Sequence, residues 1–331
     1  MADVIYAFGD VHGREDLLDR AETIIRAISP HIPAVSGLVV GLGDFCDKGP
    51  KSREVYQRLM RGTMAGMPLE CIRGNHDVWF AEAIAAFKAR RHGWQSWLER
   101  GDEAALACLR SFGVKIPPGQ RDENFFRRVM AGAVANVPDD LLSFIRGMRP
   151  VLIEGGAIFT HAGLDPASTP DMQENETYIL GTPVFWQKPH DFGMPVCVGH
   201  SVMPQPYLSS QIVGLDTGAD DSGILTIAAI SGGRVVLVIA ATDTKLSRLP
   251  VIVDGGDDDY LGKTNLWWRA VIRAAPEPPI LGFDDPARLH RFCAVTGVGR
   301  CRAMSMAQAR SMGSRPGMML LTTRSCKPSR I

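Results

Sequence analysis

Short apolar runs alternate with amphipathic segments in the first part of the chain. The run VIYAF precedes a helical pattern from about Glu15 to Ile28, and the runs GLVVGL and LECI are each followed by another helical pattern. Short apolar runs are typical of buried strands, and apolar residues spaced three and four positions apart are typical of amphipathic helices. The alternation therefore predicts an α/β fold in which helices cover the strands.

The pattern changes twice further along the chain. From Val78 to Arg146 it is mostly helical and contains no strand-like run of any length, which predicts a helical cap over about residues 78–147. After Pro150 strand-like runs dominate, and two of them, GILTIAAI and RVVLVIAA, flank a Ser-Gly-Gly turn typical of a hairpin. We therefore expect one catalytic domain over residues 1–242, with the cap inserted into it.

The last ninety residues have a different character. The periodicity fades near Asp243, and the segment AAPEPPI has the composition of a linker. From Pro286 onward the chain contains nine arginines or lysines and no acidic residue. We expect an extension without an assigned role at residues 243–285 and a basic, poorly ordered tail at residues 286–331.

Composition and charge exclude several classes of protein. The 331 residues are 45% hydrophobic, which supports a sizeable core, and 36 basic residues balance 36 acidic ones. We therefore expect neither a nucleic-acid partner nor membrane association, and nothing indicates the oligomeric state. The N-terminal residues resemble no targeting signal, and seven cysteines without a C-x-x-C pair fit reduced thiols, so we expect a cytoplasmic location.

Five apolar runs end in glycine-rich turns that carry metal-type ligands. The turns read GDVHG, GDFCDKG, RGNHD, HAG and GHS. Loops at the carboxyl ends of strands converge in open α/β sheets, and imidazole and carboxylate donors without thiolate suit borderline to hard divalent ions. The sequence predicts a site for two such ions, with Mn²⁺ as first choice and Fe²⁺ or Zn²⁺ as alternatives. The predicted ligands are Asp10, His12, Asp44, Asn75, His161 and His200.

Each of these residues has a simpler interpretation when it is considered alone. Asp44 could cap a helix, Asp47 could be a turn residue, and any single histidine could form ordinary hydrogen bonds. Cys46 is most simply a small apolar side chain, with a redox role beside the metals as the alternative. The recurrence of such turns after five strand-like runs favours the metal site.

The same five motifs, in this order, resemble the signature of the phosphoprotein phosphatases within the calcineurin-like metallophosphoesterases. The resemblance covers about residues 4–242 and is strongest to the bacterial and phage-type serine/threonine phosphatases. It implies a four-layer α/β/β/α metallophosphoesterase sandwich with a helical cap. It assigns Asp10, His12 and Asp44 to one metal. Its assignment for the other metal is Asp44, Asn75, His161 and His200.

The resemblance also implies roles for residues beside the metals. His76 would be the proton donor and Asp47 the carboxylate that orients it, while Arg73 would bind phosphate. Lys48 and Lys188 would also bind phosphate, at positions where arginine is usual in the family. Lysine keeps the positive charge but cannot make the bidentate contacts of a guanidinium group.

These observations favour a dinuclear-metal phosphomonoesterase that acts on phosphoserine or phosphothreonine in proteins. A metal-bridging hydroxide would attack phosphorus in line, and His76 would protonate the leaving alkoxide. The expected partner is a phosphorylated protein or a small phosphoester. One alternative is a dinucleoside polyphosphate hydrolase, although that branch of the family usually has Asn in place of Asp47. Another is a catalytically impaired binding protein, as Lys48 and Lys188 suggest.

Overall fold

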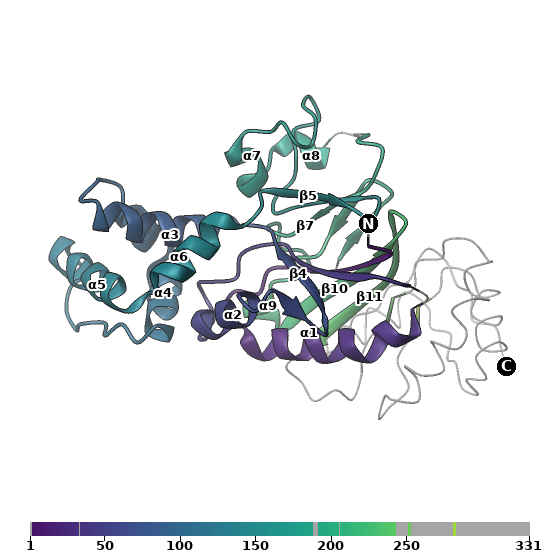
Figure 1. Ribbon diagram of the computed structural model, residues 1–331. Coiled ribbons are helices and arrows are strands. Elements are labelled where there is room, and N and C mark those ends of the chain that lie inside the picture. The colour runs from purple at the N-terminus through teal and green to yellow at the C-terminus, as the bar shows by residue number, and fades with distance from the viewer. Residues whose placement is uncertain are drawn as a thin grey trace, which may run out of the picture.

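A computed structural model describes residues 2–32, 34–187, 191–204 and 206–242, together with two short strands further along the chain. Two β-sheets stack face to face in its centre, and helices cover the outer face of each (Figure 1). A group of further helices projects from one side of this body (Figure 1). Lys188, the tail at residues 286–331 and most of residues 243–285 lie outside the described residues.

The larger sheet contains eight strands: β1 (Val4–Phe8), β2 (Gly37–Gly41), β3 (Thr63–Met64), β4 (Met67–Cys71), β10 (Ile224–Ser231), β11 (Arg234–Thr242), β12 (Val251–Ile252) and β13 (Leu281–Gly282). Their order is β13-β12-β11-β10-β1-β2-β4-β3. The neighbours β1, β2 and β4 run parallel, whereas β10 pairs antiparallel with both β1 and β11. The hairpin predicted near the end of the catalytic domain is therefore present as β10 and β11.

The smaller sheet contains five strands: β5 (Val151–Glu154), β6 (Ala157–Thr160), β7 (Val196–Val198), β8 (Tyr207–Leu208) and β9 (Ile212–Gly214). Their order is β5-β6-β7-β9-β8. The strands β6, β7 and β9 run parallel, and the short strands β5 and β8 pair antiparallel at the two edges. Both sheets thus contain parallel strands whose carboxyl ends can carry ligands.

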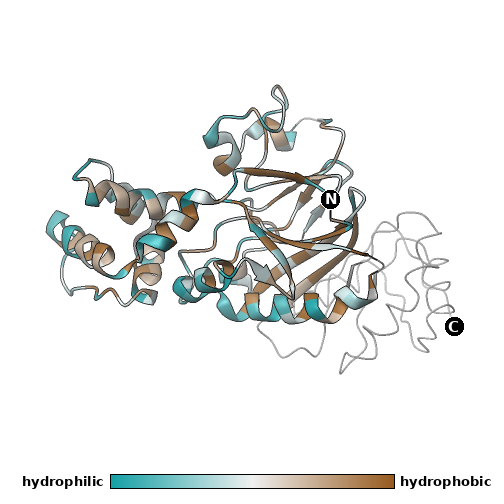
Figure 2. Ribbon diagram, viewed as in Figure 1, coloured by the Kyte–Doolittle hydropathy of each residue, from teal (hydrophilic) through white to brown (hydrophobic). Residues whose placement is uncertain are grey.

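Alternating residues of β1 show how the layers are held together. Tyr6 and Phe8 pack with helix α1 (Glu15–Ile28) in one hydrophobic cluster, while Ile5 and Ala7 join a second cluster with residues of the smaller sheet. All four side chains are fully buried. A strand buried on both faces is expected to be continuously apolar, which explains the run VIYAF. Figure 2 shows the strands of both sheets as mainly hydrophobic.

Helices form the two outer layers of the body. α1 lies along the outer face of the larger sheet, followed by a short 3₁₀ turn (Ser29–His31), and α2 (Ser52–Leu59) packs beside it (Figure 1). Two short helices, α7 (Asn175–Leu180) and α8 (Pro183–Gln187), cover the smaller sheet. The order helix, sheet, sheet, helix confirms the predicted four-layer class of fold.

Four helices between β4 and β5 form the projecting group, which we call the cap: α3 (Asn75–Lys88), α4 (Gln95–Ser111), α5 (Glu123–Asn136) and α6 (Asp139–Gly147). Aromatic side chains hold it together, since the ring centroid of Phe80 lies 5.3 Å from that of Trp97 and 5.6 Å from that of Phe112. The helical character predicted for this part of the chain is confirmed. The first helix begins at Asn75, three residues before the predicted Val78.

Several short elements were not anticipated from the sequence. They are α7, α8, the helix α9 (Ala219–Ser222) and the two-residue strands β3 and β8. None of these helices exceeds six residues. Such lengths span fewer than two turns, so the hydrophobic periodicity that identifies a helix cannot develop.

Candidate metal centre

The predicted ligands meet at the carboxyl ends of five strands drawn from both sheets. Asp10 and His12 follow β1, Asp44 follows β2, and Asn75 follows β4. From the smaller sheet, His161 follows β6 and His200 follows β7. The larger sheet thus supplies four candidate ligands and the smaller sheet two, at one edge of the sandwich.

Asp44 lies at the centre of this group. Its Oδ1 atom is 3.4 Å from His161 Nε2, and its Oδ2 atom is 3.7 Å from His12 Nε2 and 4.0 Å from His76 Nε2. Two sets of donor atoms, each within a span of 4.8 Å, share this carboxylate: one includes His12 and His76, and the other includes His161 and His200. Asp44 is therefore the one residue positioned to contact ions in both sets.

Hydrogen bonds to the backbone orient the imidazole rings. Nδ1 of His12 is 2.8 Å from the carbonyl oxygen of Cys46, and Nδ1 of His161 is 2.8 Å from that of Leu42. When Nδ1 donates to a carbonyl, Nε2 is left as the free ligand atom, which is the usual arrangement around metal-binding histidines. Both Nε2 atoms face the carboxylate of Asp44.

The remaining candidate ligands, Asn75 and Asp10, contact residues of the second donor set. Oδ1 of Asn75 is 3.0 Å from Nε2 of His161 and 2.9 Å from Nδ1 of His200. The carboxylate of Asp10 accepts a hydrogen bond from the backbone N–H of His200, with both oxygens within 3.2 Å. The donor atoms from the two sheets are therefore in mutual contact.

His76 forms a separate pair with Asp47 at the edge of the centre. Nδ1 of His76 lies 2.7 Å from Oδ2 of the fully buried Asp47, and the indole N–H of Trp97 donates to the same oxygen at 2.9 Å. The side chain of His76 is 20% exposed, whereas that of Asp47 is inaccessible. One face of the pair can thus meet a substrate while the carboxylate stays fixed behind it.

The backbone of the site is unusual. Five of the seven described non-glycine residues with positive φ belong to the ligand turns, namely His12, Asp44, Asp47, Lys48 and His200. Side chains rarely adopt this left-handed conformation, and it clusters at functional sites where the surrounding structure enforces it. A Cβ atom on Gly74 would collide with Asp44, and one on Gly199 would collide with Asp10, so glycine is needed beside both carboxylates.

Burial and neighbouring charges shift the pKa values of the buried groups. Burial, together with the nearby carboxylates of Asp216 and Asp44, raises the pKa of Asp10 well above its usual range. Burial also opposes ionisation of Asp44, but the surrounding imidazoles, led by His161, hold the pKa of Asp44 well below its usual range. Burial and the neighbouring His161 lower the pKa of His200 to about 4, so His200 presents a neutral imidazole near neutral pH.

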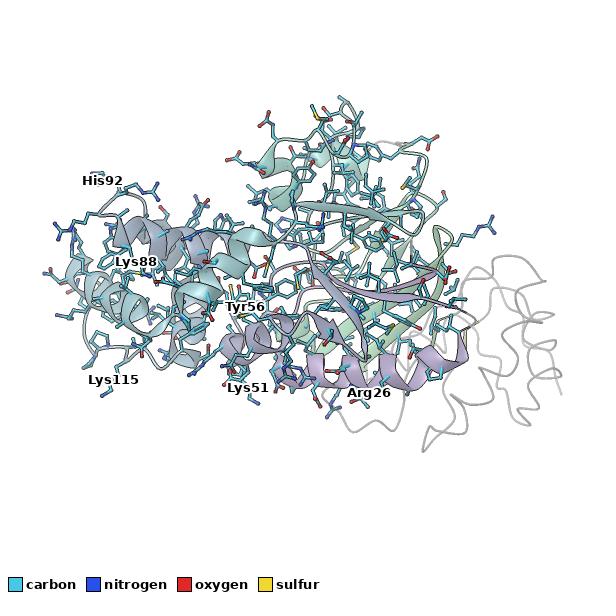
Figure 3. The ribbon with its side chains drawn as sticks, viewed as in Figure 1. Arg26, Lys51, Tyr56, Lys88, His92 and Lys115 are labelled. Carbon is cyan, nitrogen blue, oxygen red and sulfur yellow. The ribbon has the colours of Figure 1, made fainter. Side chains whose placement is uncertain are left out.

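Asp77 is the main residue of the site that sequence reasoning missed. Its buried carboxylate accepts hydrogen bonds from the backbone N–H groups of Asp44, Phe45 and Gly74 at 2.9–3.0 Å, and from the hydroxyl of Tyr56 at 2.6 Å. Tyr56, labelled in Figure 3, lies between the helices of the body and the start of the cap. Asp77 thus ties the turn after β2 to the start of α3. The motif RGNHD contained this aspartate, but no role was assigned to it.

Of the three predicted phosphate-binding residues, two can be placed. Arg73 Nη2 donates to Oδ1 of Asn175 at 2.7 Å, and Lys48 Nζ lies 3.5 Å from Oδ1 of Asp220. Lys48 directly follows Asp47 in the turn after β2, and its positive charge acts to lower the pKa of both His76 and His12. Lys188 lies outside the described residues, so its predicted contact with phosphate stays a prediction.

The donor set fits divalent metal ions. Carboxylate, amide and imidazole groups without thiolate are typical ligands of Mn²⁺, Fe²⁺ and Zn²⁺. The buried carboxylates of Asp10 and Asp44 are close enough to repel each other, and a cation between them would relieve this repulsion. Nδ1 of His12 and Nδ1 of His161 are already hydrogen-bonded to backbone carbonyls, which leaves their Nε2 atoms for metal ions. The residues present therefore match what two ions sharing one carboxylate require.

A family comparison agrees with this arrangement. The model of the calcineurin-like phosphoesterases matches residues 4–204, a range that contains the whole candidate centre. The chain belongs to the calcineurin-like phosphoesterase family. The fold, the hydrolytic class of the superfamily and the usual pair of divalent metals follow from this membership.

The solved structures that resemble this phosphoesterase include proteins named for different activities. A putative diadenosine tetraphosphatase is 19% identical with a TM-score of 0.48, and the match covers 73% of this chain and 95% of that chain. A cold-active protein-tyrosine phosphatase from a Shewanella species is 14% identical with a TM-score of 0.44, and the match covers 73% of this chain and 78% of that chain. A protein serine/threonine phosphatase from Saccharomyces cerevisiae is 13% identical with a TM-score of 0.38, and the match covers 78% of this chain and 77% of that chain.

No curated protein matches this chain. Among the described helices of the phosphoesterase, none has both the length and the apolar character needed to cross a membrane.

Proposed function

We propose that this phosphoesterase is a dinuclear-metal phosphomonoesterase that hydrolyses phosphoserine and phosphothreonine in proteins. Its metal ligands would be Asp10, His12, Asp44, Asn75, His161 and His200, with Mn²⁺ as the expected ion. We propose a cytoplasmic location, which the free thiols of the described cysteines support.

The pair of His76 and Asp47 is the observation that carries this proposal. Hydrolysis of an alkyl phosphate produces an alkoxide that must gain a proton, and a positioned imidazolium is a suitable donor. Burial alone would lower the pKa of His76, but the hydrogen bond that its Nδ1–H donates to Asp47 and the charge of Asp44 raise that pKa above its ordinary value. These interactions favour the protonated form of His76, which lies beside the centre and is partly open to solvent.

When bound, the two metal ions would supply Lewis-acid stabilisation of phosphate charge and make an attacking water acidic enough to react at neutral pH. The protein positions everything else. Asp44 contacts both donor sets, Asp47 and Trp97 fix the ring of His76, and Arg73 and Lys48 add positive charge for the phosphate oxygens. Serine and threonine phosphates have poor leaving groups, so they are the esters that benefit most from the His76 proton.

Hydrolysis assays on the metal-loaded chain test the proposal. We expect p-nitrophenyl phosphate and a phosphoserine peptide to be hydrolysed in the presence of Mn²⁺, with Fe²⁺ and Zn²⁺ compared at equal concentration. A dinucleoside tetraphosphate serves as the competing substrate. Preference for the dinucleotide would identify a dinucleoside polyphosphate hydrolase instead, and lack of turnover on every substrate with two metals bound would identify a phosphatase-like binding protein.

A further inference from the structure

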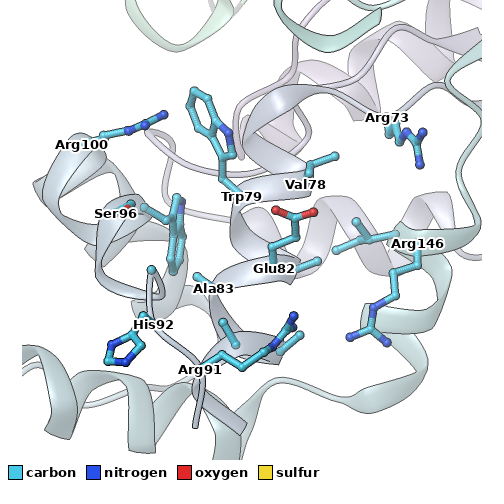
Figure 4. A pocket seen from close by; sticks show the side chains of 16 residues that line it. Arg73, Val78, Trp79, Glu82, Ala83, Arg91, His92, Ser96, Arg100 and Arg146 are labelled. Carbon is cyan, nitrogen blue, oxygen red and sulfur yellow. The ribbon is translucent and has the colours of Figure 1, made fainter. Parts of the chain in front are cut away.

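A cavity of about 720 Å³ lies in the cap (Figure 4). Helix α3 forms its floor through Val78, Glu82 and Ala86, while α4, α6 and the segment after α3 form its walls. We call this cavity the cap groove. The basic residues that line it at neutral pH are Arg73, Arg91, Arg100 and Arg146.

The cap groove carries a large excess of positive charge. Glu82 is the one acidic residue among its lining residues, against four arginines. In the described part of the chain, Arg91 and Arg146 are exposed and form no ion pair, and the guanidinium of Arg100 lies 5.3 Å from the ring centroid of Trp79. Arginines left without acidic partners in a cavity favour an anionic ligand that supplies those partners.

The groove continues directly from the catalytic pair. Asn75 and His76 begin α3, and the ring centroid of Trp79, one turn later, lies 5.2 Å from that of His76. From Val78 to Ala86 the helix rises about 12 Å at 1.5 Å per residue. About four residues of an extended peptide span the same length. A peptide whose phosphoresidue lies at the metal centre can therefore place its neighbours along this groove.

We infer that the cap groove binds acidic residues flanking the phosphorylated residue of a protein substrate, an inference that rests on the proposed function. Figure 4 shows Arg100 and Arg146 on opposite sides of the groove, with Arg91 at a third position. Carboxylates spaced along a peptide can pair with such separated arginines. A polyphosphate, whose negative charge is concentrated, fits less well. The carboxylate of Glu82 lies on the floor between these arginines and would repel it.

Peptide kinetics with a matched pair of double variants test this inference. The substrates are three phosphoserine peptides of equal length, with four acidic residues before the phosphoserine, four after it, or glutamine at all of these positions. The groove variant is Arg91→Glu with Arg146→Glu. The control is Lys115→Glu with Arg128→Glu, which reverses two exposed cap charges outside the groove. Circular dichroism establishes that both variants are folded.

At low salt, at least one of the two acidic peptides should have a kcat/KM about tenfold higher than that of the neutral peptide. We expect this in the wild type and in the control variant, since several exposed ion pairs act together. In the groove variant the ratio should fall to about one. A second readout, fluorescence anisotropy, is independent of turnover. The unphosphorylated acidic peptide should bind the wild type and the control variant after their metal has been removed with a chelator. It should not bind the groove variant.

Two results would overturn the inference while leaving the phosphatase proposal intact. These are equal kcat/KM for the acidic and neutral peptides in the wild type, or an acidic preference that survives in the groove variant. A different result would overturn both proposals: none of the three phosphopeptides is hydrolysed, whereas a dinucleoside tetraphosphate is hydrolysed and its turnover falls in the groove variant. The cap groove would then bind a nucleotide.

Discussion

The carboxylate of Asp44 approaches imidazoles on both of its sides, His12 through one oxygen and His161 through the other. No other candidate ligand belongs to both donor sets within the described chain. A single side chain therefore controls whether the centre can hold two ions, and its loss should differ in kind from the loss of any other ligand.

We expect Asp44→Asn to weaken the binding of both metal ions. Loss of groups that merely orient metal ligands lowers affinity about 10- to 100-fold, so loss of a shared carboxylate should lower it by more than about 100-fold. Elemental analysis at limiting metal should find less than one ion per chain. Asn75→Ala serves as the comparison and should retain the ion bound by His12. Greater loss of both ions in Asn75→Ala would show that Asp44 is not the shared ligand.

The proton donor can be tested separately from the metals. His76→Asn should retain the metal content but lower kcat by about 10²- to 10⁴-fold for an alkyl phosphate. Turnover of p-nitrophenyl phosphate, whose leaving group needs no proton, should fall much less. Equal losses for the two esters in steady-state kinetics would remove His76 from proton transfer.

The pH dependence should reveal the role of Asp47. The hydrogen bond that His76 donates to Asp47 raises the pKa of His76 against the opposing effect of burial, so protonated His76 persists to higher pH and is lost as the pH rises through this value. In Asp47→Asn the imidazolium loses its carboxylate partner. We expect the alkaline limb of the kcat profile for an alkyl phosphate to move to lower pH. An unchanged limb would assign that ionisation to another group.

At the scale of elements, strand ends and cap helices make different contributions to the site. The ends of β1, β2, β4, β6 and β7 supply the candidate ligands, whereas α4 supplies no ligand but reaches Asp47 through Trp97. Trp97 is buried and packs against Phe80 of α3. The cap is therefore connected to the catalytic pair by a hydrogen bond as well as by the chain.

Trp97→Phe should reveal this connection. The substitution keeps an aromatic ring in the cap and removes the N–H that donates to Asp47, a hydrogen bond of about 1 kcal/mol. We expect kcat for an alkyl phosphate to fall about fivefold while metal content is unchanged. Trp94→Phe is a suitable control, because Trp94 is a buried cap residue that packs on Phe87 rather than on the pair. Similar kinetic losses in both variants would point to general loosening of the cap.

The sequence was most informative where its signals are local. Each ligand turn follows an apolar run within a few residues and is marked by glycine, so both the strand and its functional turn could be recognised. The bond between Trp97 and Asp47 joins residues 50 positions apart, and that between Arg73 and Asn175 joins residues 102 apart. Such contacts form only when the chain packs, and no pattern in a single sequence predicts them.

At the scale of the whole molecule, the centre joins the two sheets. Asp10 and Asn75 follow strands of the larger sheet, and His161 and His200 follow strands of the smaller one. Ions held by both groups would link the two sheets of the sandwich, and they would bind only the folded chain. Metal binding should therefore contribute to the free energy of unfolding.

We expect chelation to lower the thermal stability as well as abolish activity. A ligand at 100 times its dissociation constant stabilises the folded state by about 2.7 kcal/mol. Differential scanning calorimetry should show a lower melting temperature after metal removal, with recovery on addition of Mn²⁺. An unchanged melting temperature in a chain that binds two ions would mean that the sheets are fixed equally well without them.

The left-handed backbone of the ligand turns has an evolutionary consequence. His12, Asp44, Asp47, Lys48 and His200 each occupy a conformation that disfavours side chains by about 1 kcal/mol. Glycine would relieve this strain at every one of these positions, but it would also remove the side chain that we propose as a metal ligand, catalytic group or phosphate-binding group. Selection for heat tolerance alone would thus drive these turns toward glycine and toward an inert fold. Their present residues are consistent with selection that values turnover above stability.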